Sequence, residues 1–326
     1  NVAKLLAIPD MFCFVAFMGS PTTAAALPLV DAAKMPIIGP VTGSAGFRKT
    51  FNPWTIHVRA GYDDEALTML RLFVTELQYR RISIIYQDDL FGEPAKNIMV
   101  TALAAMKLEA TSIHSYERQK IAEYDYAAYA QEVWNNRPQG VILYTIEGFS
   151  NAFMTEFFKL QTYPVSFVTG SWMGDMKLRF LRSQNLNASN FYQTQVVPHP
   201  SQSQLNITRR YRAAIIANGG SAEQFDFLSL EGYIVGRIVV EALRRTSETN
   251  GTLDRAEFLK AIYTTKIFSV DELLAGPYSN DCVHDPGTAN GRSSMCYCNQ
   301  GLRSVSTTRA TENYEFSPAG FKDMVY

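Results

Sequence analysis

The chain has 326 residues, of which 47% are hydrophobic and 19% charged, a composition typical of a globular protein large enough for two domains. Its formal net charge of −1 gives no electrostatic reason to expect a nucleic-acid partner. Four cysteines are present, and three of them cluster; together with three N-glycosylation sequons they favour an oxidising, secretory compartment.

Residues 11–30 form an uncharged stretch of about the length of a membrane span. Ser20, Pro21 and Thr22 lie in its middle, so we interpret it instead as a strand, a turn and a helix. The opening NVAKLLAIPD lacks the basic and apolar regions of a signal peptide. We therefore expect a soluble chain that, if it is secreted, is a fragment of a longer protein.

Apolar runs of strand length alternate with amphipathic segments of helix length along the first half of the chain. This alternation predicts parallel sheets covered by helices. The strands are expected at 11–18, 54–60, 81–87, 110–116, 140–145 and 165–170. The helices between them are expected at 21–34, 62–79, 92–107, 123–136 and 149–161.

The alternation of strands and helices ends after residue 190, where one more strand at 191–197 is followed by two helices, at 201–217 and 225–245. In the second of these helices Phe227, Leu230, Ile234 and Ile238 have helical spacing. After Leu274 the composition shifts to Gly, Ser, Asn, Asp and Cys, so 275–310 is expected to be irregular and to depend on disulfides.

Two small polar corners near the start of the chain are candidates for binding an anion. GSPTT (19–23) follows the first strand and opens a helix, with Ser20 as the expected N-cap, and GPVTGSAG (39–46) follows the next apolar run. Loops at the carboxyl ends of neighbouring strands converge on one crevice, so the candidate ligand hydroxyls are those of Ser20, Thr22, Thr42 and Ser44. The alternative is an ordinary capped turn, and neither a phosphate loop nor a dinucleotide fingerprint is present.

Three later corners place aromatic and polar side chains at strand ends, as small-ligand pockets do. They are DDLFGEP (88–94), IEGFS (146–150) and TGSWMGD (169–175). The candidate ligand residues in these corners are Phe91, Glu147, Phe149, Ser171 and Trp172. The alternative is that Phe91 is a packing residue and that the other corners are surface loops of ordinary content.

The cysteine cluster CVHDPGTANGRSSMCYC (282–298) has spacings that favour a disulfide loop over a zinc site with His284. Cys282 would pair with Cys296 or Cys298, and the remaining thiol would pair with Cys13 or with a cysteine outside this chain. The sequons are at Asn187, Asn206 and Asn250. No catalytic motif is present, so we expect neither an enzyme nor a cofactor or metal site.

The order of these pieces resembles the type I periplasmic-binding fold, in its leucine/isoleucine/valine-binding branch, over residues 8–277. VAFMGSPTTAAALPLVDAAKMPIIGP, RRISIIYQDDLFGEPAKN, PQGVILYTIEGFS and the helix at 225–245 carry the resemblance. It implies two hinged α/β lobes that close on a ligand. Hydroxyls and backbone N–H groups of the first lobe would hold an amino acid's carboxylate, and Phe91 of the second lobe would cover it. Ser171 stands where an acid for the ammonium group is usual, and Glu147 where an aromatic is usual. Either the charge has moved to the neighbouring loop or the ligand is not an amino acid.

A narrower resemblance is to the ectodomains of kinetoplastid receptor-type adenylate cyclases. It rests on MCYCNQGLRSV (295–305), ENYEF (312–316), FCFVAFMGSPTTAAALP (12–28) and VRAGYDDEALTML (58–70). It implies a sensor region outside the plasma membrane, on the flagellar or cell surface, linked to cAMP signalling through a membrane span and a cyclase domain that this chain lacks. Relative to that family, the first βα units of the N-terminal lobe are expected to be missing.

The resulting expectation is a two-lobed sensor that binds a small amino-acid-like solute in its inter-lobe cleft, with a homodimer as a further partner to test. The alternatives are a ligand-free structural or dimerisation ectodomain and a flavodoxin-like cytosolic enzyme. The expected domains are 1–84 (partial N-terminal lobe), 85–197 (second lobe), 198–274 (return to the N-terminal lobe and hinge) and 275–326 (Cys-containing extension).

Overall fold

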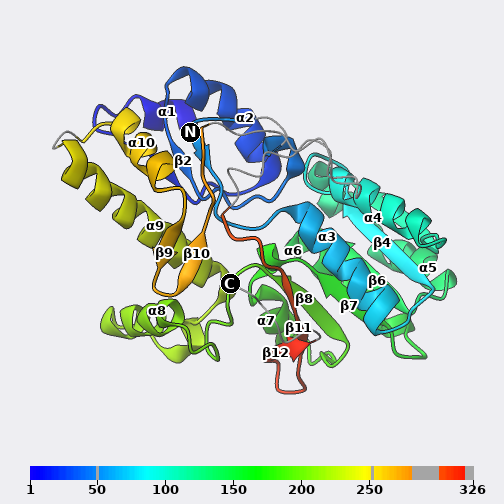
Figure 1. The fold of residues 1–326 in the computed structure, drawn as a ribbon. Helices are drawn as coiled ribbons and strands as arrows, with labels where there is room; N and C mark the ends of the chain where they lie inside the picture. Colours follow the sequence, from blue (N-terminus) through cyan, green and yellow to red (C-terminus); the bar gives the residue numbers. More distant parts are fainter. Residues whose placement is uncertain (49–50, 251–252, 281–300, 320–326) are drawn as a thin grey trace. The chain divides into compact units, whose positions relative to one another are not determined.

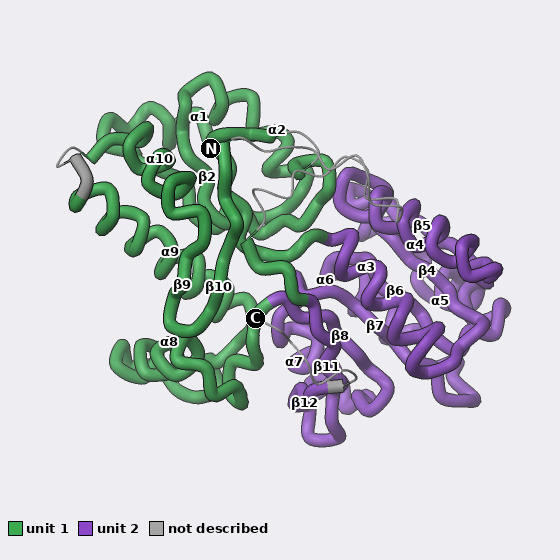
Figure 2. The backbone as a smooth tube through the Cα atoms, viewed as in Figure 1, with its two compact units in different colours: residues 1–61, 197–304, 326 green, residues 62–196, 305–325 purple. Residues whose placement is uncertain are grey.

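The computed structural model describes residues 1–48, 51–250, 253–280 and 301–319. The chain divides into two compact units, shown in different colours in Figure 2. Unit 1 comprises residues 1–61 and 197–304, and unit 2 comprises residues 62–196 and 305–325. The first part of unit 1 therefore ends at Gly61, whereas the N-terminal lobe was expected to extend to residue 84. The helix that follows Gly61 packs in the core of unit 2.

Unit 1 contains a three-stranded parallel sheet in the order β1-β2-β3 and a separate antiparallel hairpin, β9–β10 (Figure 1). Its N-terminal elements are α1 (Val2–Leu6), β1 (Phe14–Val15), α2 (Ser20–Ala32), β2 (Ile37–Ile38), η1 (Ala45–Phe47) and β3 (Thr55–Ile56). The second part of the chain adds α8 (Asn206–Ala217), η5 (Ala222–Gln224), α9 (Phe227–Asn250), α10 (Arg255–Thr265), β9 (Phe268–Val270) and β10 (Leu273–Ala275).

Unit 2 is built on a seven-stranded sheet in the order β12-β11-β8-β7-β6-β4-β5. Its first elements are α3 (Tyr62–Arg71), the π-helical turn η2 (Leu72–Glu76), β4 (Ile82–Gln87), α4 (Glu93–Ala105), β5 (Ser112–Tyr116) and η3 (Arg118–Glu123). They are followed by α5 (Tyr126–Asn135), β6 (Gly140–Tyr144), α6 (Glu147–Leu160) and β7 (Ser166–Thr169). The last are η4 (Ser171–Met173), α7 (Met176–Ser183), β8 (Phe191–Gln195), β11 (Ser306–Ala310) and β12 (Phe316–Ala319).

The strands β5, β4, β6, β7 and β8 are neighbours in this order and run parallel. Beyond β8 the sheet continues with β11, which is antiparallel to β8, and with β12, which is antiparallel to β11. The chain adds β5 on one side of β4 and then returns to add β6 on the other side. The loops after β4 and β6 therefore leave the sheet in opposite directions. This reversal is a topological switch point, the place where open α/β sheets bind ligands beyond the carboxyl ends of their strands.

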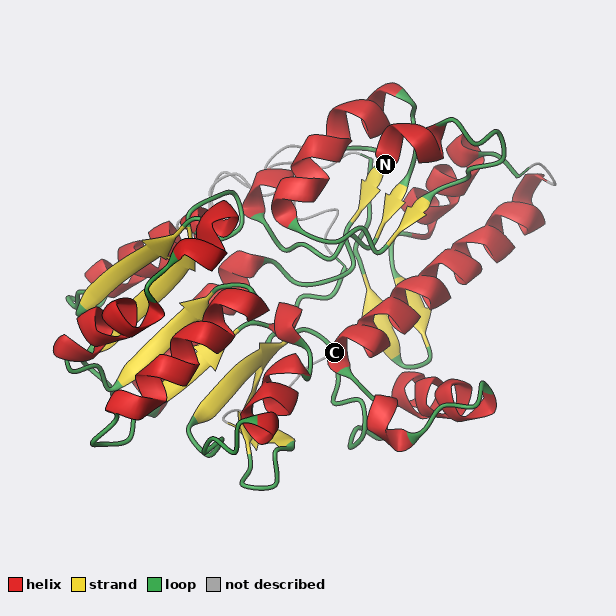
Figure 3. Cartoon of the chain, turned by 180° about the vertical axis from the view of Figure 1, so that it is seen from behind, coloured by secondary structure: helices red, strands yellow, loops and turns green. Residues whose placement is uncertain are grey.

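Helices cover both faces of the parallel part of this sheet, as the strands and helices in Figure 3 show. On one face Ile84, Ile142 and Val168 pack with residues of α3 and α4 such as Met69 and Met99, all of them buried. On the opposite face the ring of Phe157 from α6 packs edge-on against Phe167 of β7. Burial on both faces explains why these strands are nearly continuous apolar runs in the sequence.

The expected α/β architecture with parallel sheets is confirmed. Two expected strands are much shorter than their apolar runs, since 11–18 yields only β1 and 54–60 yields only β3. The residues after β1 lead into the polar corner at 19–23. The expected N-cap Ser20 is instead the first helical residue, since Gly19 takes the N-cap position with a positive φ of 95°.

The segment after Leu274 is more regular than its composition predicted. Residues 306–310 form β11 and residues 316–319 form β12, both paired in the sheet of unit 2. Residues 281–300 lie outside the described part of the chain. The helix α10 and the hairpin β9–β10 have no counterpart among the predicted elements.

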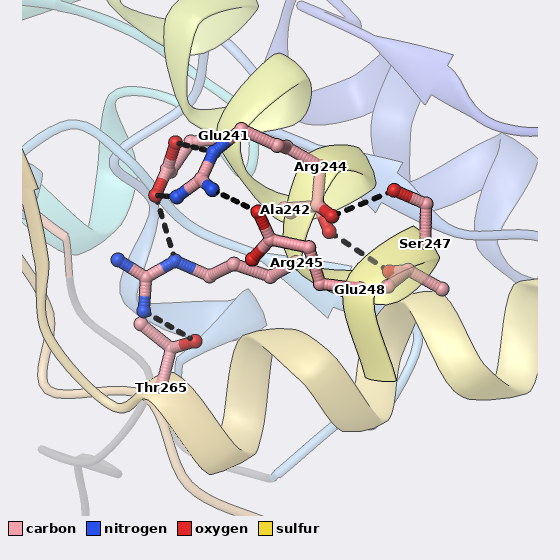
Figure 4. A network of polar contacts seen from close by, with 8 residues as sticks. Glu241, Ala242, Arg244, Arg245, Ser247, Glu248 and Thr265 are labelled. Carbon is pink, nitrogen blue, oxygen red and sulfur yellow. Dashed lines mark hydrogen bonds and ion pairs between the residues drawn. The ribbon is translucent and has the colours of Figure 1, made fainter. Parts of the chain in front are cut away.

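The C-terminal half of α9 is joined to α10 by a polar network on the surface of unit 1 (Figure 4). Both Arg244 and Arg245 donate to the carboxylate of Glu241, and Arg245 also reaches Thr265 of α10 at 3.2 Å. These hydrogen bonds and charges lower the pKa of Glu241 to about 2, against a smaller opposing effect of burial. The guanidinium of Arg245 also lies over the ring of Phe268.

Candidate functional site

The two polar corners of unit 1 meet through three of the four hydroxyl residues expected there. The hydroxyls of Ser20 and Thr42 lie 2.8 Å apart, and the backbone N–H of Ser44 donates to the Thr42 hydroxyl at 3.2 Å. All three residues are buried. Because α2 begins at Ser20, its N-terminal N–H groups face the same corner and favour a negatively charged group there.

Thr22 does not join this group. It is exposed, and its hydroxyl donates to the backbone carbonyls of Gly19, at 2.9 Å, and Met18. A hydroxyl committed to two carbonyls of its own turn stabilises the start of α2. The structure therefore assigns Thr22 a local capping contact, and its part in ligand binding stays a prediction.

In unit 2 an aromatic cluster lies at the switch point. It consists of Tyr62 at the start of α3, Phe91 after β4, Tyr144 at the end of β6 and Trp172 after β7, with ring centroids 4.5–5.9 Å apart. Phe91 is only 6% exposed, so in this conformation it packs as a core residue. Trp172 is half-buried, and its indole nitrogen donates to the carbonyl of Thr145 at 2.9 Å.

A chain of hydrogen bonds fixes the loops that carry this cluster. The Tyr116 hydroxyl at the end of β5 donates to Gln87 of β4 and accepts from the N–H of Ile146 after β6, both at 2.9 Å. Gln87 in turn donates to Asp89, whose carboxylate accepts from the N–H of Phe91 at 2.8 Å. Burial raises the pKa of Tyr116, so its hydroxyl keeps its proton and the donor role it needs here. Three strand ends are thus held in one fixed arrangement.

Ser171, expected where an acid would be usual, is bound to an acid from another element. Its N–H and its hydroxyl both donate to the carboxylate of Glu65 in α3, each at 2.9 Å. The hydroxyl of Thr194 in β8 donates to the same carboxylate at 2.5 Å. Glu65, Ser171 and Thr194 are all buried in unit 2.

Glu147, at the start of α6, is half-buried and is connected to a buried lysine. Asn151, one turn later, places its amide nitrogen 3.5 Å from the Glu147 carboxylate, and its amide oxygen accepts from the ammonium group of Lys177 in α7. Lys177 has no exposed surface, and burial lowers its pKa to about 7, with the charge of Glu147 opposing the shift. The ammonium group of Lys177 therefore partly balances the charge of the Glu147 carboxylate.

Phe149 lies apart from the cluster around Trp172. Its ring stacks on Tyr116 with centroids 3.8 Å apart and meets Tyr124 and Tyr129 edge-on. It has no exposed surface. Phe149 thus belongs to the interior between α5, α6 and β5, and a role in ligand contact stays a prediction for this residue.

Sequence reasoning missed Glu65, Tyr62, Tyr144, Asn151 and Lys177. Glu65 stands in the acidic first turn of α3, where an acid is explained by the helix dipole alone. Within α3 the side chains of Glu65, Ala66 and Met69 are buried, whereas Leu67 is only half-buried.

Within the described residues, no group of three His, Cys, Asp or Glu side chains has a geometry for holding a metal ion. Cys13 is a half-buried free thiol, and Cys282, Cys296, Cys298 and His284 lie outside the described residues. Among the sequons, Asn187 is exposed and Asn206 is half-buried. The side chain of Asn250 is not among those described.

Comparison with protein families agrees with this geometry. The family model for periplasmic binding proteins matches residues 1–292, and the chain belongs to this family. A possible leucine/isoleucine/valine-binding protein from Rhodopirellula baltica is 21% identical in a structural superposition that covers 100% of this chain and 82% of that one, with a TM-score of 0.78. A branched-chain amino-acid ABC transporter protein from Thermus thermophilus, solved with bound valine, is 12% identical over 96% of this chain and 78% of that one, with a TM-score of 0.73. Together these likenesses establish the type I fold.

Among curated proteins, the receptor-type adenylate cyclase ESAG 4 of Trypanosoma brucei brucei is 20% identical in an alignment of 323 residues that covers 91% of this chain. The chain spans only 26% of the length of that cyclase. Along the described ranges of the chain, no helix has the length and apolar character that crossing a bilayer requires. The class of protein is therefore a receptor-like ligand-binding fold, and the family match replaces the flavodoxin-like alternative.

Proposed function

We propose that this chain is the extracellular sensor region of a receptor-type adenylate cyclase and that it binds a small amino-acid-like solute. The observation that carries the proposal is the buried trio Ser20, Thr42 and Ser44 at the N-terminus of α2. Hydroxyls and helix N–H groups at one corner suit a carboxylate without any cationic side chain. Likeness to proteins named for binding branched-chain amino acids supports the same ligand class.

The corner of unit 2 supports the other half of such a ligand. Aromatic rings at a switch point offer apolar contact, and Glu65 and Glu147 bring negative charge to the same end of the sheet. We propose that Phe91, Glu147, Ser171 and Trp172 contribute here and that ligand binding shifts the protein between conformations of different ligand affinity.

The link to cAMP signalling rests on the 20% identity to a cyclase of which this chain spans 26%. In this proposal the membrane is reached only through segments outside this chain, and the protein lies on the outer face of the plasma membrane. The sequons and the cysteine cluster support that location. A homodimer belongs to the same proposal, and sedimentation of the purified chain would test it.

Thermal denaturation with each of the twenty L-amino acids tests ligand binding. At saturating concentration, at least one amino acid should raise the melting temperature of the wild type. The variant Ser20→Ala/Thr42→Val should lose that shift, whereas Thr22→Val should keep it, because the Thr22 hydroxyl is committed to backbone carbonyls. If none of the twenty stabilises the wild type, the proposal fails.

A second candidate function, a structural or dimerisation ectodomain without a ligand, is favoured by one observation. Phe91 and Phe149, expected to contact a ligand, are 6% and 0% exposed and pack on neighbouring rings of unit 2. Such packing fills part of the expected ligand surface with the protein's own side chains. A flat thermal-shift screen combined with a stable dimer in sedimentation would support this second function instead.

A further inference from the structure

A cavity of about 390 Å³ lies on unit 1 between the C-terminal end of α8 and the first turns of α9. Its lining comes from α8, from the turn that follows this helix, from η5 and from α9. None of the lining residues belongs to α2 or to the two polar corners, so the cavity is not part of the carboxylate site proposed above. Its volume lies within the range of about 300–1,000 Å³ that is usual for small-molecule sites.

Two glycines after α8 shape this cavity. Gly219 has a positive φ of 80°, which ends the helix and turns the chain. A Cβ at residue 220 would lie 2.4 Å from the side-chain oxygen of Gln224 and 2.7 Å from a methyl group of Ile215, so a glycine here lets η5 approach the end of α8. The hydroxyl of Tyr211 joins the two elements, because it donates to the carbonyl of Gln224 at 3.3 Å.

Among the described residues that line this cavity, none carries a charge. The polar side chains of the lining are the amides and hydroxyls of Asn218, Gln224, Ser229, Tyr211 and Tyr233. Three other cavities of unit 1, by contrast, each include at least one charged side chain in their lining. A charged ligand group would lose hydration here without gaining a counter-charge, which is unfavourable. The occupant that fits this lining is therefore neutral.

The polar side chains offer both donors and acceptors to an occupant. The amide nitrogen of Asn218 donates to the carbonyl of Ala214 at 2.8 Å, which leaves the amide oxygen as an acceptor. The side-chain oxygen of Gln224 accepts from the N–H of Ser221 at 2.8 Å, which leaves its amide nitrogen as a donor. Ser229 is exposed, and its hydroxyl has no hydrogen-bond partner in the part of the chain that the structure describes, so it can both donate and accept.

Apolar surface completes the lining. Ala214 and Ile215 of α8 contribute aliphatic groups, and the half-buried ring of Tyr233 has its centroid 5.7 Å from that of Tyr211. An aromatic ring beside amides and hydroxyls suits a ligand that has apolar C–H surface and a hydrogen-bonding edge. A neutral hexose combines the two, because its ring carbons present C–H groups and each of its hydroxyls both donates and accepts.

We propose that this cavity is a carbohydrate site that takes a neutral hexose. The inference goes beyond the proposed function, because it assigns a second kind of ligand to unit 1 and does not depend on amino-acid binding. For so small a ligand the dissociation constant should be on the order of 1 mM.

Saturation-transfer NMR on the purified chain tests the proposal with glucose, galactose and mannose, and with glucuronate and glucosamine as charged comparisons. At least one neutral hexose should give a signal, and the charged sugars should give weaker signals or none. Ala214→Phe fills the cavity and should abolish the signal. Ala213→Phe is the matched control, because Ala213 is the exposed neighbour on the same helix and does not line the cavity; it should bind as the wild type does.

A second variant covers the case in which Ala214→Phe does not fold by circular dichroism. Asn218→Ala/Ser229→Ala removes two polar contacts at exposed positions and should weaken hexose binding at least about fivefold. The inference is overturned if no neutral hexose binds the wild type, if the charged sugars bind equally well, or if folded Ala214→Phe or the double variant binds as the wild type does. None of these results bears on the amino-acid site, which has its own readout in the thermal shift.

Discussion

Arg59 and Glu231, which are 172 positions apart in the sequence, form a fully buried ion pair in unit 1. Two guanidinium nitrogens of Arg59 lie 3.1 Å from the two carboxylate oxygens of Glu231. The pair joins the segment after β3 to α9, and Arg48 donates to the carbonyl of Arg59 at 2.8 Å. This arrangement holds the segment after β3 that leads to Gly61, where the first part of unit 1 ends.

Removing one member of this pair should destabilise unit 1 strongly. Glu231→Gln removes the carboxylate charge that pairs with the buried Arg59 guanidinium, so the free energy of unfolding should fall by about 3–5 kcal/mol. Urea denaturation followed by circular dichroism measures this change. The double variant Arg59→Met/Glu231→Met should recover part of the loss, and a double variant no more stable than Glu231→Gln would contradict this account.

The network of Figure 4 should contribute far less, although it contains more charged contacts. The side chains of Arg244 and Glu248 are 54% and 58% exposed, so solvent screens their attraction. Glu241→Gln should lower the free energy of unfolding by roughly 1 kcal/mol or less, and 0.5 M salt should remove most of the difference. A loss comparable to that of Glu231→Gln would show that the contact of Arg245 with Thr265 and Phe268 dominates instead.

The sequence predicted the architecture well because its strongest signals are local. Apolar runs such as RISIIYQ and GVILYT become β4 and β6, and α9 buries Phe227, Leu230, Ile234 and Ile238 as their spacing predicted. The parallel direction of the strands follows from the alternation of strands and helices. The composition after Leu274 predicted an irregular segment, and for Ser306–Ala310 this was wrong. These residues join the sheet by pairing with β8, a long-range contact that leaves no local pattern in the sequence.

The candidate site was predictable only in part, because its contacts also join residues that are distant in the sequence. The sequence places Phe91 and Trp172 at strand ends, but it cannot show that their rings pack 4.9 Å apart on each other. Nor can it show that Glu65, in an ordinary acidic first turn, faces inward to Ser171, 106 positions away. Hydrogen-bond partners distant in sequence depend on tertiary packing, which propensity and periodicity do not encode.

Gly170 should be required for the position of Trp172. A Cβ added at residue 170 would lie 1.9 Å from the indole ring, so Gly170→Ala must displace the ring and break its hydrogen bond to Thr145. The tryptophan fluorescence maximum should shift to longer wavelength, and stability should fall by about 1–3 kcal/mol. Gly148→Ala is the matched control, because nothing lies within 4 Å of its added Cβ. An unchanged spectrum in Gly170→Ala would contradict the packing described.

Asn187 should carry a glycan more readily than Asn206 when the chain is expressed through a secretory pathway. Asn187 is exposed, whereas the amide nitrogen of Asn206 donates to Glu272 at 2.7 Å and its backbone N–H donates to the same carboxylate. Mass spectrometry of Asn187→Gln should show the loss of one glycan. Asn206→Gln should leave the mass of the glycans unchanged, and the reverse pattern would refute the ranking.

His57 should make unit 1 sensitive to acid. Its pKa lies well below 6.5, first because the ring is buried and second because Arg48 is nearby, and the hydrogen bond to the Phe47 carbonyl only partly opposes these effects. The folded state therefore binds the proton more weakly than the unfolded state does. The stabilisation is complete above the unfolded pKa of about 6.5 and is lost as the pH falls below it, at up to about 1.4 kcal/mol per pH unit.

Denaturation of His57→Gln at several pH values isolates this contribution. Glutamine can still donate to the Phe47 carbonyl but takes up no proton, so the loss of stability between pH 6.5 and 5 should be shallower than in the wild type. His114→Gln is the comparison, because burial also lowers the pKa of His114 but the Glu132 carboxylate opposes that shift. His114→Gln should therefore change the dependence of stability on pH less than His57→Gln does. Equal slopes in wild type and His57→Gln would mean that other groups account for the acid sensitivity.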